Sequence, residues 1–245
     1  MDKIEVTNRN ILKKHRIPVG FGQSACVFMG KENNVVKYFY DGYLESLKHQ
    51  GDYLGKLSKI CNLSNEKIIG PKKLIFENNK FIGYSYEYIK GKQLDEISTF
   101  TKINDLFIDY SNACNEIKRL TDNYFDFFDL YARNIVFYNN KYYFIDLDKG
   151  NFDEDSSKEK LYLESRKKFF EEIVYSIYGL RHSDYPKYKN VDINSYLNGY
   201  NHDEAAIKKF LEEIKNACNE EKPTIRKVRK NTLASKKATF YHQCF

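Results

Sequence analysis

The chain has 245 residues, a formal net charge of +6 and 16% aromatic residues without tryptophan. A content of 42% hydrophobic and 30% charged residues is typical of a folded globular protein and argues against a disordered one. The first ten residues lack the apolar core of a signal peptide, and no apolar run approaches the ~20 residues of a membrane span. We therefore expect a cytoplasmic protein without a membrane span.

A glycine-containing turn separates two strand-like stretches near the start of the chain. Residues 17–28 (IPVGFGQSACVF) place Gly20, Gly22 and the small Ala25 between apolar runs, and the turn-forming KENN leads into a third apolar run, VVKYF. The pattern predicts a strand, a glycine-rich turn, a strand, a hairpin turn and a third strand. Small residues at such a turn let backbone N–H groups approach phosphate oxygens, although an ordinary hairpin with a bulge has the same pattern.

Lys37 is the charged residue of the third predicted strand. It is either an edge-strand lysine or a cation directed at the phosphates of a ligand held by the glycine turn. The next segment, 41–60, has apolar residues at helical spacing interrupted by two glycines. Its polar face carries Glu45 and Asp52, either of which would pair with Lys37 unless the face is simply solvated.

Two further strands complete the predicted N-terminal sheet. Residues 73–76 and 81–89 flank the turn-forming ENNK, which gives an antiparallel sheet of about five strands. Strand patterning ends near Gly91, and helical patterning follows. The α+β chain is therefore expected to have a first lobe over 1–91, with one helix, and a mainly helical second lobe over 92–222.

The second predicted lobe contains long helices. Segments 102–121, 161–178 and 205–218 have apolar residues at helical spacing. Residues 223–245 are rich in lysine and arginine and predict a basic C-terminal tail. Such a tail is either solvated or in contact with nucleic acid, anionic lipid or an acidic partner.

A short predicted hairpin carries the most informative polar residues. Asp129 and Asn134 precede the strand-like IVFY, an Asn-Asn turn joins it to YYFI, and Asp146 follows directly. Because Asn tolerates positive φ, the turn is expected to be tight and to bring the three side chains to one end of the hairpin. Their oxygens suit a hard cation and a hydroxyl acceptor, as phosphoryl transfer requires, although each residue alone is typical of an ordinary turn.

The order of these features resembles the protein-kinase-like superfamily across roughly residues 15–180. GFGQSACV is similar to the glycine-rich loop, with Ala25 in place of the third glycine. VVK resembles the strand with the phosphate-pairing lysine, and YEYI resembles the hinge. The resemblance implies a bilobal fold that binds ATP and Mg²⁺ between its lobes.

The resemblance also implies a role for each matching residue. Lys37 would neutralise the nucleotide phosphates, Asp129 would be the catalytic base, and Asn134 and Asp146 would be metal ligands. Asp148 would bind a second metal, cap the following turn or face solvent. The residues expected at the nucleotide are Gly20, Gly22, Ala25, Val27, Val35, Lys37, Glu45, Glu87 and Ile89.

Several departures from the family pattern make the chain resemble a small, atypical bacterial-type kinase. Phe-Phe replaces His-Arg before Asp129, which removes the usual receptor for an activation-loop phosphate. Tyr131 replaces the lysine beside the base, and Arg133 is a candidate substitute. Asp-Leu-Asp replaces Asp-Phe-Gly, no Ala-Pro-Glu follows, and the loop before the next predicted helix is short, so a peptide-docking platform is expected to be reduced.

Three functions remain open from the sequence. A protein Ser/Thr kinase-like enzyme is favoured by the hinge-like EYIKG. A small-molecule kinase is favoured by the missing lysine, the short loop and Asp-Leu-Asp. A non-catalytic nucleotide-binding scaffold would have no need to keep Lys37, Asp129, Asn134 and Asp146 together.

Overall fold

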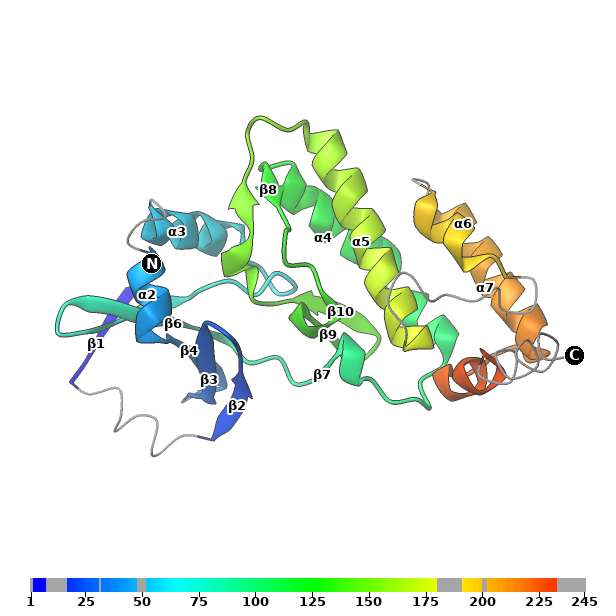
Figure 1. Ribbon diagram of the computed structural model, residues 1–245, viewed down its shortest axis with the longest axis horizontal. Helices are drawn as coiled ribbons and strands as arrows, with labels where there is room; N and C mark the ends of the chain where they lie inside the picture. Colours follow the sequence, from blue (N-terminus) through cyan, green and yellow to red (C-terminus); the bar gives the residue numbers. More distant parts are fainter. Residues whose placement is uncertain are drawn as a thin grey trace, which may run out of the picture. The chain divides into compact units, whose positions relative to one another are not determined.

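The computed structural model describes residues 2–7, 17–30, 32–47, 52–179, 191–199 and 202–232. The fold is α+β, and the chain divides into two compact units (Figure 1). Unit 1 consists of Met1–Lys90 and Phe144–Asn151, and unit 2 of Gly91–Tyr143 and Phe152–Phe245. The segment Phe144–Asn151 therefore belongs to the unit of the N-terminal sheet, which a single division near Gly91 does not anticipate.

Unit 1 is built on a mixed sheet of six strands. Across the sheet the strands are β1 (Asp2–Val6), β5 (Lys73–Glu77), β6 (Lys80–Glu87), β4 (Asn34–Phe39), β3 (Ala25–Met29) and β2 (Pro18–Phe21). Neighbours are antiparallel except β1, which runs parallel to β5. The expected all-antiparallel sheet was therefore wrong at one edge, where the mostly exposed β1 lacks the apolar alternation that marks a half-buried strand.

Short turns with left-handed backbone join the hairpins. Both central residues have positive φ at Glu32-Asn33, Asn78-Asn79 and Asn139-Asn140. Two successive residues of positive φ match the right-handed twist of the flanking strands, and Asn accepts this backbone at low cost. The tight turn predicted at Asn139-Asn140 is confirmed.

The two faces of the sheet differ in character. One face packs an apolar cluster formed by Cys26, Phe28, Val36, Tyr38, Ile75 and Ile82. Lys37 lies between Val36 and Tyr38 on β4, so its side chain faces the opposite side of the sheet. There its cross-strand partners are Val27 on β3 and Tyr84 on β6.

The segment predicted as one interrupted helix over 41–60 contains two helices, α2 (Asp41–Leu47) and α3 (Tyr53–Leu63). Residues 48–51 lie outside the described residues. Asp52 caps α3, because its carboxylate accepts a hydrogen bond from the Gly55 amide at 2.7 Å. This role gives Asp52 a local partner at the helix start.

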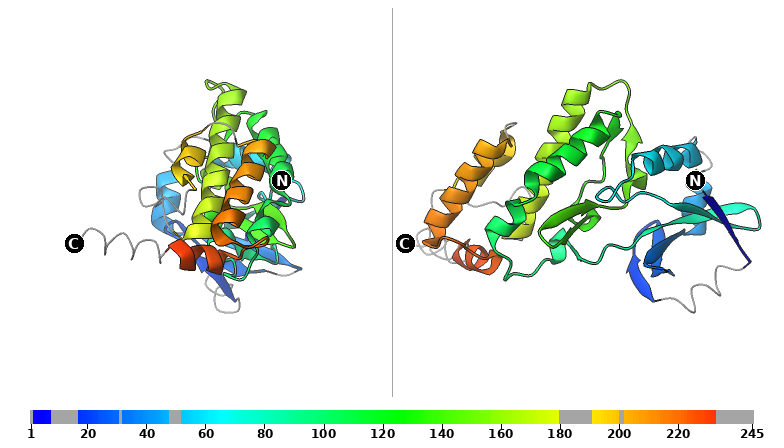
Figure 2. Two further views of the ribbon diagram at one scale, coloured as in Figure 1. Left: turned by 90° about the vertical axis from the view of Figure 1, so that its right-hand side faces the viewer. Right: turned by 180° about the vertical axis from the view of Figure 1, so that it is seen from behind.

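Unit 2 is mainly helical. Its helices are α4 (Tyr110–Thr121), α5 (Lys158–Tyr178), α6 (Ile193–Asn198) and α7 (Glu204–Cys218), with 3₁₀ turns η1 (Leu94–Glu96), η2 (Ile103–Phe107) and η3 (Ala132–Asn134). A small sheet has the order β10 (Lys141–Phe144), β9 (Ile135–Tyr138) and β7 (Lys92–Gln93), and β8 (Phe125–Asp126) pairs with β11 (Asn151–Phe152). α4 packs alongside α5 (Figure 2).

The helix predicted over 102–121 is divided in the structure. η2 ends before Asp109, and α4 begins after it. The buried Asp109 carboxylate accepts hydrogen bonds from the Asn112 side chain at 3.0 Å and from the Tyr142 amide at 3.1 Å. The helix is interrupted at Asp109, whose side chain joins the start of α4 to β10 by hydrogen bonds.

Part of the predicted basic tail is packed into unit 2. Residues 225–232 are helical, and Ile225 and Val228 are fully buried. The Arg229 guanidinium donates to the carbonyls of Ser176 (2.7 Å) and Ile177 (3.0 Å), so it stabilises the negative end of α5. Residues 223–232 are therefore not a solvated tail, and residues 233–245 lie outside the described residues.

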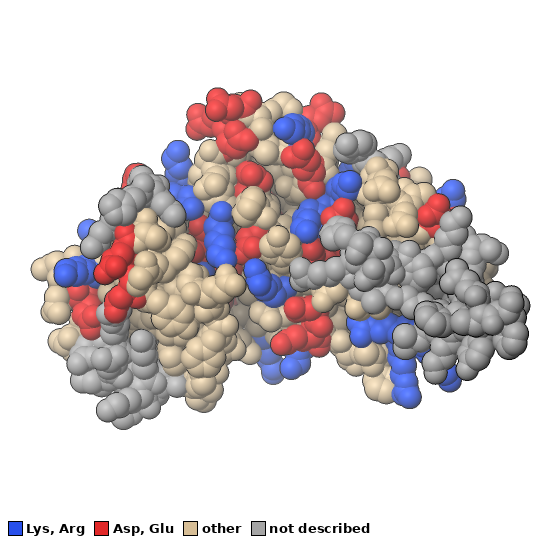
Figure 3. All heavy atoms as spheres, viewed as in Figure 1, with Lys and Arg blue, Asp and Glu red and all other residues tan. Residues whose placement is uncertain are grey.

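On the face drawn in Figure 3, Lys and Arg side chains are interspersed with Asp and Glu side chains. Among the residues described, no helix combines the length and apolarity that a membrane crossing requires.

A buried histidine predicts how the stability of the protein depends on pH. His202 is 2% exposed, and its Nε2 contacts the Tyr196 carbonyl at 2.8 Å. Burial lowers the pKa of His202 below its usual 6.5, so the unfolded chain binds this proton more tightly than the folded one. The free energy of unfolding should therefore decrease as the pH falls below about 6.5, by at most about 1.4 kcal/mol per pH unit.

Urea denaturation at several pH values checks this dependence. In His202→Gln, which keeps an N–H donor but does not titrate, the slope between about pH 6.5 and 5 should be shallower than in the wild type. Equal slopes in the two proteins would assign the pH dependence to other groups.

Candidate functional site

The glycine turn joins β2 to β3. The Gly22 amide donates to the Ala25 carbonyl at 2.9 Å, which closes the turn. A Cβ added at Gly20 would meet no atom within 4 Å, and one added at Gly22 would come no closer than 3.6 Å to Ala25 O. Packing within the chain thus has room for a methyl group at both positions, so contacts inside the protein do not by themselves require glycine there.

A buried cluster of polar groups surrounds the side chain of Lys37. Its ammonium forms ion pairs with Asp146 and, at 2.7 Å, with Asp148 Oδ1. The Tyr84 hydroxyl donates to Asp148 Oδ1 at 3.0 Å, and the Tyr53 hydroxyl donates to Asp148 Oδ2 at 2.8 Å. We call these five residues the Lys37 cluster, and all of them belong to unit 1.

Backbone hydrogen bonds join the segment that carries Asp146 and Asp148 to the rest of unit 1. The Phe144 amide donates to Lys67 O at 2.8 Å, and the Ile69 amide donates to Phe144 O at 2.9 Å. Asp146 then adopts left-handed backbone angles (φ 61°, ψ 41°) before the 3₁₀ turn η4 (Leu147–Lys149). This tight reversal lets Asp146 and Asp148, two residues apart, contact the same ammonium.

The electrostatic environment distinguishes the two carboxylates. Burial raises the pKa of Asp146 to about 6. The ion pair with Lys37 favours a lower pKa, but the negative charge of Asp148 opposes that effect. Burial alone would also raise the pKa of Asp148, but Lys37 and the hydrogen bonds it accepts lower that pKa to about 2. Burial alone would lower the pKa of Lys37, but the two carboxylates more than compensate and raise it.

Exposure separates the two aspartates further. The Asp146 side chain is 27% exposed, whereas that of Asp148 is fully buried. Asp148 therefore does not face solvent, and its oxygens already accept from Lys37, Tyr53 and Tyr84. A metal ion at Asp148 would have to displace these donors, so Asp146 is the carboxylate of the pair that suits a metal ion.

The acidic partners of Lys37 are not the helical residues expected from the sequence. Glu45 is exposed on α2, and Asp52 caps α3. Both lie close to Lys37 in sequence, whereas the ion pairs of Lys37 span 109 and 111 residues. An ion pair between Glu45 and Lys37 was the reason to place Glu45 at the nucleotide site, and the structure pairs Lys37 with Asp146 and Asp148 instead.

The remaining residues expected at a nucleotide are distributed over unit 1. Val27 lies directly across from Lys37 in the sheet, and Val35 is buried on the same strand as Lys37. Glu87 ends β6, where its carboxylate pairs with Lys72 at 2.8 Å. The expected adenine contacts of the Glu87 and Ile89 backbones stay predictions.

A second set of polar residues is organised around Asp129 in unit 2. The Asn134 side-chain amide donates to the Asp129 carbonyl at 2.8 Å and to Asp129 Oδ2 at 3.0 Å. Arg133 approaches Asp129 Oδ1 at 3.5 Å. This assignment of the amide leaves the Asn134 side-chain oxygen as an acceptor or metal ligand.

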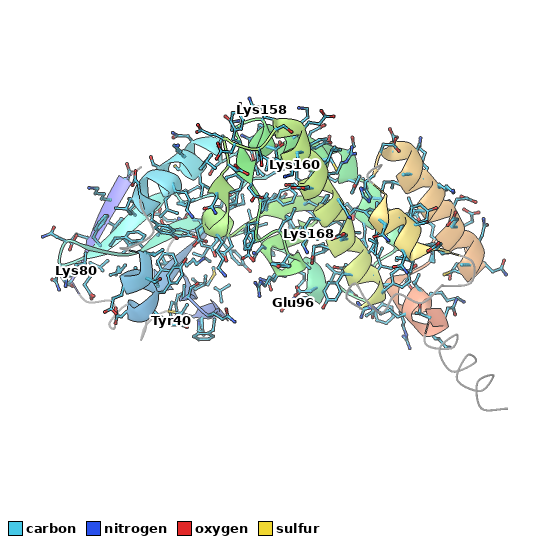
Figure 4. The ribbon with its side chains drawn as sticks, turned by 45° about the horizontal axis from the view of Figure 1, so that its top comes forward. Tyr40, Lys80, Glu96, Lys158, Lys160 and Lys168 are labelled. Carbon is cyan, nitrogen blue, oxygen red and sulfur yellow. The ribbon has the colours of Figure 1, made fainter. Side chains whose placement is uncertain are left out.

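Residues that the sequence did not single out support this loop. Glu172 is 4% exposed on α5 and accepts a hydrogen bond from the Ala132 amide at 2.7 Å. Lys168, labelled on α5 in Figure 4, pairs with Glu172 at 3.1 Å and lies 4.6 Å from the centre of the Tyr131 ring. An acid on the apolar face of the predicted helix was the available signal for Glu172, since such groups are rarely buried without partners.

Comparison with known proteins finds no family model and no curated protein that matches this chain. The two sets of residues and their geometry are therefore what supports a function.

Proposed function

We propose that the protein is an ATP- and Mg²⁺-dependent phosphotransferase with a bilobal arrangement similar to that of protein kinases. The observation that carries this proposal is the Lys37 cluster. A buried strand lysine stands beside a partly exposed carboxylate, Asp146, and is held by a fully buried one, Asp148. A fixed cation next to an accessible carboxylate suits a phosphate chain and its metal ion.

Each group has a role in this chemistry. Lys37 neutralises phosphate oxygens, and Asp146 supplies a hard oxygen ligand of the kind that Mg²⁺ prefers. The Asn134 side-chain oxygen, in unit 2, is proposed as a further ligand of this kind. Bound Mg²⁺ would offset the negative charge of the phosphates. The glycine turn, which has space at Gly20, gives phosphate oxygens access to backbone N–H groups.

Asp129 is the proposed base of the reaction. The acceptor hydroxyl oxygen forms a bond to the γ-phosphorus, the bond from that phosphorus to the bridging oxygen of ADP breaks, and Asp129 takes the hydroxyl proton. The Asn134 amide fixes the Asp129 carboxylate by its 3.0 Å hydrogen bond. Arg133, at 3.5 Å from Asp129, is a candidate to replace the lysine whose position Tyr131 occupies.

The acceptor is proposed to be a protein hydroxyl, as in Ser/Thr kinases. A small-molecule acceptor is the second candidate, and the short segment between η4 and α5 favours it. That segment contains only β11 and the turn before Lys158, which leaves little chain for a peptide-docking platform.

Thermal unfolding with and without nucleotide tests the proposal. Mg²⁺-ATP should raise the melting temperature of the wild type, because a ligand that binds only the folded state stabilises it. Incubation with γ-labelled ATP and fractionated cell extract should then label either protein or small molecules, which identifies the acceptor class. A wild type that shows no shift with Mg²⁺-ATP would contradict the proposed function.

A further inference from the structure

The buried ammonium of Lys37 requires a counter-charge that stays in place during the proposed reaction. An unpaired charge in a protein interior is strongly unfavourable. Both Asp146 and Asp148 now provide that charge. Asp146 is also the proposed metal ligand, so bound Mg²⁺ would share the negative charge of its carboxylate with Lys37. Asp148 would then supply the counter-charge that belongs to Lys37 throughout.

The geometry of Asp148 fits a permanent counter-ion. Three donors from three elements fix its carboxylate, namely Lys37 on β4, Tyr84 on β6 and Tyr53 on α3. The Asp148 side chain is fully buried, so solvent does not compete for these bonds. Charge-assisted hydrogen bonds of this kind are among the strongest in proteins.

Tyr53 connects this carboxylate to helix α3. It is the first residue of α3, directly after the capping Asp52. Its ring packs at 6.0 Å from the Phe39 ring and 6.2 Å from the Phe81 ring, so the position of the hydroxyl is set by the helix start and the sheet. A displacement of the start of α3 would remove the donor from Asp148 Oδ2.

We propose that Asp148 is the permanent counter-ion of Lys37 and that Tyr53 is a positioning residue, through which α3 controls how firmly Lys37 is held. This inference rests on the proposed function for its role in nucleotide binding. Helix α3 thus acts on Lys37 through Tyr53 and Asp148, which lie 95 residues apart in the chain, rather than through an acidic residue of the helix.

Lysine acetylation by N-hydroxysuccinimidyl acetate, followed by peptide mass spectrometry, tests the contact without nucleotide. Loss of the Asp148 charge or its tyrosine donor should increase labelling of Lys37 relative to the exposed Lys80, because a Lys37 side chain that is held less firmly in its buried position becomes accessible to the reagent more often. We expect the order Asp148→Asn above Tyr53→Phe above wild type. Tyr40→Phe, a change on a partly exposed tyrosine of unit 1, should match the wild type (Figure 4).

Nucleotide kinetics separate positioning from general stability. Tyr53→Phe keeps the ring and its packing, so the melting temperature should stay close to that of Tyr40→Phe. Its KM for ATP should rise by roughly ten-fold, the equivalent of one hydrogen bond to a charged group, while the KM for the acceptor stays unchanged. Equal rises in both KM values would indicate a structural defect instead.

The outcomes distinguish this inference from the proposed function. Unchanged Lys37 labelling in Tyr53→Phe and in folded Asp148→Asn overturns the counter-ion assignment, whether or not ATP binds. Wild-type protein that does not bind Mg²⁺-ATP overturns the phosphotransferase function, and the labelling order still decides the counter-ion. Should Asp148→Asn fail to fold, Tyr53→Phe alone decides it.

Discussion

Asp129→Asn should lose phosphoryl transfer by roughly 10²–10⁴-fold while binding Mg²⁺-ATP with nearly wild-type affinity. The carboxylate is the proposed proton acceptor, and an amide of the same shape has no basic oxygen of comparable strength. The contact with the Asn134 side chain can persist, since an asparagine oxygen accepts the same hydrogen bond as Asp129 Oδ2. Single-turnover rates with labelled ATP, measured beside nucleotide affinity, provide the test.

Asp126→Asn is the matched control for this change. Asp126 is a partly buried acid in β8, three residues before Asp129, and lies outside the proposed site. Its variant should retain the wild-type rate. Full activity in Asp129→Asn would remove Asp129 from the role of base, and equal losses in both variants would indicate a general effect of removing charge from this region.

Most of the sheet could be predicted because its strands and turns are encoded locally. Alternating apolar residues marked β3 to β6, and the Asn-containing turns supplied the positive φ that short hairpins require. β1 was missed because its pairing with β5 is parallel and joins residues about seventy positions apart in the chain. Its sequence, DKIEV, is mostly exposed and carries no strong local signal.

The same distinction applies to the Lys37 cluster. Lys37 stood out as the charged residue within an apolar strand, and Asp146 as a charged residue directly after one. The hydrogen bonds of Tyr53 and Tyr84 to Asp148 span 95 and 64 residues, and no local spacing indicates such pairs. Glu45 and Asp52, the acids of the helical segment next in the chain, were therefore the predicted partners of Lys37. The acids that pair with it in the structure, Asp146 and Asp148, follow the β9–β10 hairpin.

Removing the charge of Asp146 and removing that of Asp148 should have different effects on ATP binding. Asp146→Asn should raise the Mg²⁺ concentration needed for half-maximal ATP binding by at least about 100-fold, since a metal ligand is lost. Asp148→Asn should leave Asp146, the proposed metal ligand, in place and instead remove one of the two carboxylates that pair with the Lys37 ammonium. Titrations of ATP binding at several Mg²⁺ concentrations distinguish these effects.

The free energy of unfolding tests the same two variants independently, because the direction of each pKa shift predicts the sign of its change. The pKa of Asp146 is raised to about 6, so its ionised form is disfavoured in the folded state, and Asp146→Asn at pH 7 should keep or raise the free energy of unfolding. The pKa of Asp148 is lowered to about 2, so its ionised form stabilises the fold above the usual aspartate pKa, and Asp148→Asn should lower the free energy of unfolding by about 3 kcal/mol. Equal losses of stability in the two variants would show that both carboxylates hold Lys37 alike. Loss of Mg²⁺ dependence in Asp148→Asn but not in Asp146→Asn would instead place the metal at Asp148.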